Sequence, residues 1–276
     1  MLAYERFGSG DPLVLIHGIG HRRQGWYPVV DRLAEEFDVI IPDLPGHGAT
    51  TTPLDRSVSP RDALRDAFVE LFDGLGIERP HVAGNSLGGL IALELGADDL
   101  ARSVTALSPA GFWGGPRDFR YVSTLFGSVM TAARASSPMA GTLTKSPTGR
   151  MAMMGWLYQH PENLSPEMAL GDLRNMLQAR RTVSYLLKHA YTFTPGEPSD
   201  VPVTVAWSDH DKVLLPYQAR RARQLLPNAH HLWLDHCGHV PMPDDPVLVA
   251  ETIIAGARAG VPTASTSSST TAGSPA

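Results

Sequence analysis

Residues 84–88, Gly-Asn-Ser-Leu-Gly, place a serine between two glycines directly after a short apolar run. This arrangement is typical of a nucleophile elbow, a sharp strand-to-helix turn that lifts a serine hydroxyl above the edge of a sheet. The glycines let strand and helix approach each other without a clash of Cβ atoms. A plain glycine-rich turn has the same pattern, so the interpretation of Ser86 as a nucleophile depends on partners elsewhere in the chain.

A serine hydroxyl is a weak nucleophile at neutral pH, and it needs an imidazole as base and a carboxylate to orient that imidazole. Both residue types occur downstream, each after an apolar run that predicts a strand. Asp209 and Asp211 follow residues 201–207, and His239 follows residues 230–234. The order serine, aspartate, histidine accompanies this kind of elbow. We therefore predict nucleophilic chemistry in which Ser86 attacks and His239 accepts its proton.

The elements that position these residues follow from hydrophobic patterning. Apolar runs alternate with amphipathic stretches, which predicts buried parallel strands between helices and hence an α/β fold. Strands are expected at 12–17, 37–42, 81–83, 103–107, 201–207 and 230–234. Helices are expected at 25–36, 60–74, 87–97, 216–226 and 246–260.

Residues 112–195 break this alternation and show no convincing strand. They hold seven of the nine methionines and end in a predicted helical pair at 166–192. They carry nine basic and four acidic side chains, which leaves a charge of -10 for the rest of a chain whose total is -5. We predict a helical insertion at 112–195 in a core of residues 1–111 and 196–260. Residues 261–276 have no charged or aromatic side chain and are expected to be a disordered tail.

Taken together, these segments resemble the α/β-hydrolase superfamily over residues 2–111 and about 201–260. Three further segments agree with it: His-Gly-Ile-Gly at 17–20, Asp-Leu-Pro-Gly-His-Gly at 43–48 and Cys-Gly-His at 237–239. The resemblance implies an α/β-hydrolase fold, with a mostly parallel sheet flanked by helices, and a helical cap formed by the insertion. It also implies a serine hydrolase that needs no cofactor.

The resemblance assigns two further roles. The family's Trp-Gly-x-x-Asp pattern favours Asp211 over Asp209 as the partner of His239, although Ser208 replaces the pattern's glycine. Asp209 is then a loop carboxylate or a helix-capping residue. The negative charge that develops on the attacked carbonyl needs fixed donors. Leu87 supplies one backbone amide to this oxyanion hole, and the resemblance indicates Ile19 for the other.

The expected substrate is a small molecule with an ester-type bond, cleaved through an acyl-enzyme on Ser86. Methionine and aromatic side chains of the insertion would form an adaptable apolar lining, or simply the core of the cap. The aromatic candidates are Trp113, Phe119, Phe126, Trp156 and Tyr158. The basic excess of the insertion would either hold an anionic substrate or balance the acidic core across their interface.

Two alternative functions remain open from the sequence. Asn85 resembles the residue before the serine in family members that hydrolyse carbon-carbon bonds of aromatic ring-cleavage products. Those enzymes usually carry Trp after the catalytic histidine, where this chain has Val240, and Arg180 or Arg181 would have to replace their cap arginine. Other proteins of the fold retain the triad and act as small-molecule receptors.

Composition excludes other classes. Without a cluster of basic residues, nucleic acid is not an expected partner. The chain shows no secretory signal and no apolar run near the length of about 20 residues that spans a bilayer. The single cysteine, Cys237, allows no internal disulfide, so we expect a cytoplasmic protein of undetermined oligomeric state. His230 and His231 would point to opposite faces of a strand, and no metal site is expected. The histidines expected at the surface or core edge are His21, His81, His160 and His189.

Overall fold

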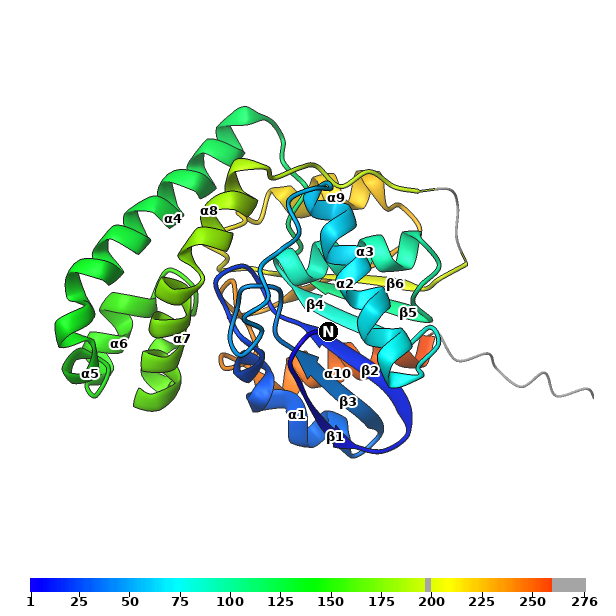
Figure 1. Ribbon diagram of the computed structural model, residues 1–276, viewed down its shortest axis with the longest axis horizontal. Helices are drawn as coiled ribbons and strands as arrows, with labels where there is room; N and C mark the ends of the chain where they lie inside the picture. Colours follow the sequence, from blue (N-terminus) through cyan, green and yellow to red (C-terminus); the bar gives the residue numbers. More distant parts are fainter. Residues whose placement is uncertain (197–199, 260–276) are drawn as a thin grey trace, which may run out of the picture.

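The computed structural model describes residues 1–196 and 200–259 of the chain (Figure 1). Within these residues seven strands form one sheet in the order β1-β3-β2-β4-β5-β6-β7. Their bounds are β1 Tyr4–Gly8, β2 Asp11–Ile16, β3 Phe37–Pro42, β4 His81–Asn85, β5 Ser103–Leu107, β6 Val203–Ser208 and β7 His230–Leu234. Strand β1 runs antiparallel to β3, and every other pair is parallel. The mostly parallel sheet flanked by helices confirms the predicted fold class.

The strand register brings the carboxyl ends of the parallel strands to one edge of the sheet. Ile16 pairs with Gly84, Asn85 pairs with Leu107, and Leu107 pairs with Ala206. The next pairing, Ser208 with Leu234, continues the same edge. Every residue of β3, β4 and β5 is buried, as expected for central parallel strands covered on both faces. The loops that follow β2, β4, β6 and β7 are therefore neighbours.

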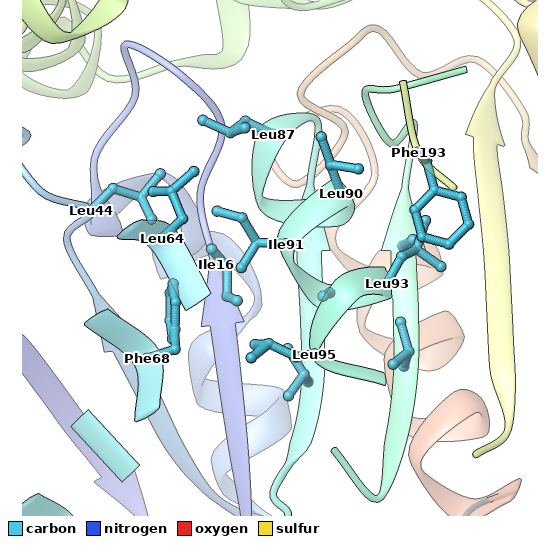
Figure 2. Packing of buried hydrophobic residues seen from close by; sticks show 14 of the residues in the cluster. Ile16, Leu44, Leu64, Phe68, Leu87, Leu90, Ile91, Leu93, Leu95 and Phe193 are labelled. Atoms are coloured by element: carbon cyan, nitrogen blue, oxygen red, sulfur yellow. The ribbon is translucent and has the colours of Figure 1, made fainter. Parts of the chain in front are cut away.

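Helices cover both faces of the sheet and enclose two apolar layers (Figure 1). One layer contains η1 Arg23–Trp26, α1 Tyr27–Ala34 and α10 Pro246–Ala259, and the other contains α2 Pro60–Leu75, α3 Leu87–Ala97 and α9 Gln218–Leu225. Ten residues of α3 are buried, and all of them except Glu94 are apolar or glycine. Figure 2 shows Leu90, Ile91 and Leu93 packed with side chains of the surrounding elements, including Phe193. The helix that follows Ser86 is thus fixed by close packing.

Residues 112–195, which we call the insertion, lie between β5 and β6. Their helices are α4 Pro116–Ser136, η2 Ser137–Met139, α5 Ala140–Leu143, α6 Pro147–Met154, η3 Pro161–Asn163, α7 Pro166–Gln178 and α8 Arg180–Lys188. Helix α7 begins where the Ser165 side chain accepts a hydrogen bond from the Met168 amide, with proline at the first helical position. In Figure 1 the helices α4 to α8 extend to one side of the sheet. The helical pair predicted at 166–192 corresponds to α7 and α8.

Most predicted elements agree with the structure to within two or three residues. Strand β1 was not predicted, because its residues Tyr-Glu-Arg-Phe-Gly are only partly buried at the edge of the sheet and give no apolar run. The predicted tail at 261–276 lies outside the described residues. Across the part of the chain that the structure describes, no helix has both the length and the apolar character to span a membrane.

Candidate active site

Ser86 sits in the strained turn between β4 and α3, with φ +57° and ψ -116°. A Cβ atom at Gly84 would lie 2.1 Å from the carbonyl oxygen of Gly88, and one at Gly88 would lie 2.0 Å from that of Ile16. Only glycine fits at either position, because these contacts are shorter than any Cβ tolerates. The left-handed backbone and the two close approaches are the geometry of a nucleophile elbow.

His239 and Asp211 form a buried hydrogen-bonded pair on the loops after β7 and β6. The distance from His239 Nδ1 to Asp211 Oδ2 is 2.8 Å, and the two side chains are 3% and 0% exposed. Asp211 Oδ1 accepts hydrogen bonds from the amides of Val213 and Leu214, both at 2.8 Å. A carboxylate accepts only, so His239 Nδ1 carries a hydrogen, and in the neutral ring Nε2 is the nitrogen with the lone pair. The imidazole is thus held in the tautomer that a general base requires.

Asp209, the other candidate, does not contact His239. Its carboxylate lies 2.7 Å from His210 Nδ1 and accepts a hydrogen bond from the Cys237 amide at 3.2 Å. Its side chain is 32% exposed. Of the two aspartates the structure therefore brings only Asp211 to the imidazole.

Asn85 connects the elbow to the histidine loop, which sequence reasoning did not reveal. Its Nδ2 donates to the backbone oxygen of His239 at 2.8 Å and to that of Leu107 at 3.2 Å. The side chain is almost fully buried. The residue before Ser86 therefore fixes the main chain that carries the imidazole.

The loop after β2 lies directly against Ser86. A Cβ atom at Gly18 would be 3.1 Å from the Ser86 Cβ, and the His21 amide closes a turn onto the Gly18 oxygen at 3.1 Å. Within that turn the Ile19 amide donates to no acceptor among the described residues. Leu87 is the first residue of α3, where a backbone amide has no partner inside its own helix. We call residues 18–21 the oxyanion loop, after the role that the sequence predicts for Ile19.

Two neutral histidines support this loop and the loop after β3. His17 Nε2 accepts from the Leu44 amide at 3.0 Å, and His47 Nε2 accepts from the Gly20 amide at 3.0 Å. Burial lowers the pKa of His47 to about 4, and burial together with His47 lowers the pKa of His17 well below its usual value. Both rings act as fixed hydrogen-bond partners at neutral pH.

His21 is buried beside the cavity, which corrects the expectation of a surface or core-edge residue. Its Nε2 lies 2.9 Å from the Tyr158 hydroxyl, and that hydroxyl donates to Asp172 Oδ2 at 3.1 Å. Arg22 Nε donates to the other Asp172 oxygen at 2.8 Å. Burial raises the pKa of the Asp172 carboxyl, but His21 and Arg22 outweigh that effect and hold the pKa below its usual value. This hydrogen-bonded cluster joins His21 and Arg22 of the core to Asp172 of α7.

Two apolar spaces meet at Ser86. The larger, of about 650 Å³, lies under the insertion and is also lined by His239 and the oxyanion loop. The smaller, of about 50 Å³, is enclosed by Leu87, Leu214 and residues of the insertion. Side chains that were predicted as lining and that contact the larger space are Phe126, Met151, Met153, Met154, Trp156 and Met176. Trp113 lines the smaller space, whereas Tyr158 and Phe119 line neither.

The basic side chains of the insertion make no direct contact of either kind considered for them among the described residues. Among the described residues, none of its nine basic side chains lines the larger space or forms an ion pair with the core. The ion pair that does join the two parts has the opposite sense, because the insertion supplies the acid, Asp172, and the core supplies Arg22.

A group of possible metal ligands lies outside the cavity. Asp209, His210 and His236 bring their ligand atoms within 4.8 Å of one another. The Asp209 carboxylate is already hydrogen-bonded to His210 and to the Cys237 amide, so the group is held together without an ion. Cys237 is a small buried residue, and burial raises the pKa of its thiol to about 12. None of these side chains reaches Ser86.

Comparisons with known proteins agree with this geometry. A sequence model described as "Alpha/beta hydrolase family" matches residues 13–252. The chain is 26% identical to Lipase 3 of Moraxella sp. (strain TA144) over 245 residues, which cover 85% of this chain and 73% of that protein. An esterase from Thermogutta terrifontis has a TM-score of 0.69 at 21% identity, covering 94% of this chain and 93% of its own. The meta-cleavage product hydrolase CumD has a TM-score of 0.69 at 18% identity, with coverages of 91% and 94%. These two structures share the fold.

Proposed function

Because the chain belongs to the alpha/beta hydrolase family, and is therefore a hydrolase, we propose that it is a serine hydrolase cleaving an ester-type bond of a small hydrophobic substrate. The proposal is carried by one observation: His239, which is hydrogen-bonded to buried Asp211, and the strained Ser86 line the same apolar cavity. That arrangement unites a nucleophile, a base in the correct tautomer and the carboxylate that holds it.

The reaction follows from these positions. Ser86 Oγ attacks the carbonyl carbon while its proton passes to His239 Nε2, and the backbone amides of Ile19 and Leu87 hold the oxyanion. The ester carbon-oxygen bond then breaks, and His239 returns the proton to the leaving alcohol. Water, deprotonated by His239, then attacks the acyl carbon, the bond to Ser86 Oγ breaks, and His239 returns the proton to Ser86 as the acid leaves. Asp211 keeps the imidazole oriented and stabilises its charged form throughout, and no step requires a cofactor.

We assign substrate choice to the two spaces that Ser86 lines. We propose that the insertion serves as a cap over a core of residues 1–111 and 196–260, and that its methionines form the adaptable wall of the larger space. An apolar group of medium length fits there, whereas the smaller space accepts only a short group. The named activities of Lipase 3 and of the Thermogutta terrifontis esterase support an ester substrate.

A panel of p-nitrophenyl esters of rising acyl length, from acetate to dodecanoate, tests the proposal. Turnover should be highest for a medium acyl chain, and Ser86→Ala should abolish it. A serine-directed phosphonate should label Ser86, identified by mass spectrometry, and should leave the variant unlabelled. Absence of both turnover and labelling would overturn the proposal. It would favour the alternative that the protein retains the triad and acts as a small-molecule receptor.

Carbon-carbon hydrolysis of ring-cleavage products gains no specific support from the site. Arg180 and Arg181 are exposed, and neither lines a described space at Ser86. Val240 stands where that class carries tryptophan, and the Asn85 amide holds backbone oxygens of Leu107 and His239. A panel of ring-cleavage dienoates run beside the esters distinguishes the two reactions, because faster dienoate turnover would favour the carbon-bond enzyme.

A further inference from the structure

Asn175, on helix α7 of the insertion, binds backbone groups of two core loops at once. Its Nδ2 donates to the carbonyl oxygens of Gly20 at 2.9 Å and His21 at 2.6 Å. Its Oδ1 accepts from the Gly48 amide at 2.7 Å. The side chain is 4% exposed, and both hydrogens of its amide group are used. One side chain thus joins α7 to the oxyanion loop and to the loop after β3.

These bonds complete the support of the oxyanion loop. The Gly20 amide is held by His47 and the His21 amide by Gly18, while Asn175 holds the two carbonyls that follow Ile19. Gly20 has φ +74°, and glycine turns between backbone conformations at little cost when nothing holds it. Without Asn175 the carbonyls of Gly20 and His21 lose their donor, and the turn that carries the Ile19 N–H is held less firmly.

We propose that Asn175 is a positioning residue for the oxyanion hole, so that the insertion fixes part of the catalytic geometry as well as enclosing the substrate. The assignment of Ile19 as an oxyanion donor rests on the proposed function. A misplacement of about 1 Å in a catalytic group costs on the order of 100-fold in rate. Asn175 therefore acts on the reaction through the main chain of Gly20 and His21.

Asn175 is a better probe of this support than its neighbour Asp172. Asp172 lines the larger cavity, so a change there alters substrate contact and loop support together. Asn175 lines neither space at Ser86 among the described residues. If a substitution of Asn175 changes turnover, the change therefore does not come from a lost contact with substrate.

The kinetic test uses Asn175→Ala and the nearly isosteric Asn175→Asp, which retains the volume but has no N–H to donate. Gln178→Ala is the matched control, because Gln178 lies one turn further on α7 and contacts only Gly48 of the same loops, at 3.4 Å. Both Asn175 variants should lose about 10- to 100-fold in kcat, with KM nearly unchanged. The factor should be the same for p-nitrophenyl acetate and for a medium-chain ester, and the control should retain wild-type kcat.

A second measurement needs no turnover. Amide hydrogen exchange of residues 18–22, followed by mass spectrometry without substrate, should be faster in Asn175→Ala and in Asn175→Asp than in wild type or Gln178→Ala. Circular dichroism verifies that each variant is folded. If the wild type cleaves no ester, the proposed function fails, while the exchange rates still decide whether Asn175 holds the loop.

Three results would overturn the proposal. The first is unchanged exchange at residues 18–22 in folded Asn175 variants. The second is a kcat loss confined to the longer ester, which would mean that α7 acts through the substrate cavity. The third is a rise in KM with kcat unchanged, since a donor that acts on the transition state lowers kcat.

Discussion

The two sides of Ser86 are built from different parts of the molecule. On the base side, His239 and Asp211 come from the loops after β7 and β6, and Asn85 of β4 ties the histidine loop to the elbow. On the oxyanion side, the loop after β2 is bound by Asn175, which belongs to the insertion. The register of the sheet positions the base, whereas the docking of an inserted helix positions the oxyanion donor.

The attachments of the insertion also differ from each other. Near α7 the contact is ionic, with Arg22 of the core paired to Asp172 at 2.8 Å. Near the C-terminal end of the insertion, the Tyr191 hydroxyl donates to Glu94 Oε2 on α3 at 3.0 Å. Burial raises the pKa of Glu94 to about 7. One attachment is charged throughout the neutral range, and the other changes charge within it.

The largest predicted effect tests the base side. Asp211→Asn should lower kcat/KM by about ten thousand-fold, because an amide can hold the wrong tautomer of His239. Asp209→Asn is the matched control on the same loop and should have only a small effect, since Asp209 contacts His210 and not the catalytic imidazole. Initial rates with p-nitrophenyl esters measure both. Equal and mild losses in the two variants would contradict the assignment of Asp211.

The next effect separates the two sides by pH. Activity should rise with pH between pH 5 and 8 and then level off, because only neutral imidazole accepts the serine proton. Asn175→Ala should lower the whole kcat/KM profile without moving its midpoint, since burial keeps the pKa of His47 near 4 and thus outside this range. A midpoint displaced in Asn175→Ala would show that the two sides are not independent, and a flat wild-type profile would count against His239 as the base.

The base side was predictable from the sequence to a greater extent than the oxyanion side. The spacing of residues 84–88 and the loops after two apolar runs indicated Ser86, Asp211 and His239, because short motifs encode the strand ends that the sheet aligns. The choice between Asp209 and Asp211 needed the family pattern, since spacing alone does not say which carboxylate turns inward. The contact of Asn175 with Gly20 joins residues 155 apart in the chain. No local pattern encodes such docking, and the same reason explains why His21 was expected at the surface or core edge.

The smallest effect concerns the attachment at Glu94 and is seen in stability. Burial raises the folded-state pKa of Glu94 from 4.5 to about 7, so the folded protein binds more protons than the unfolded chain between these values. The contribution of Glu94 is therefore fully present below pH 4.5 and is lost as the pH rises through about 7. Glu94→Gln stays neutral, so its free energy of unfolding relative to wild type should increase by about 2 kcal/mol between pH 5 and 8.

Urea unfolding of both proteins at pH 5 and pH 8 measures this difference. Asp98→Asn is the control, because Arg61 pairs with both Glu94 and Asp98 and the Asp98 side chain is the more exposed of the two. The difference between this variant and wild type should change little between pH 5 and pH 8. The Arg22–Asp172 attachment does not titrate between pH 5 and 8, because His21 and Arg22 keep the pKa of Asp172 below its usual value. An identical pH dependence in wild type and Glu94→Gln would contradict the statement that the Glu94 attachment changes charge in the neutral range while the Asp172 attachment does not.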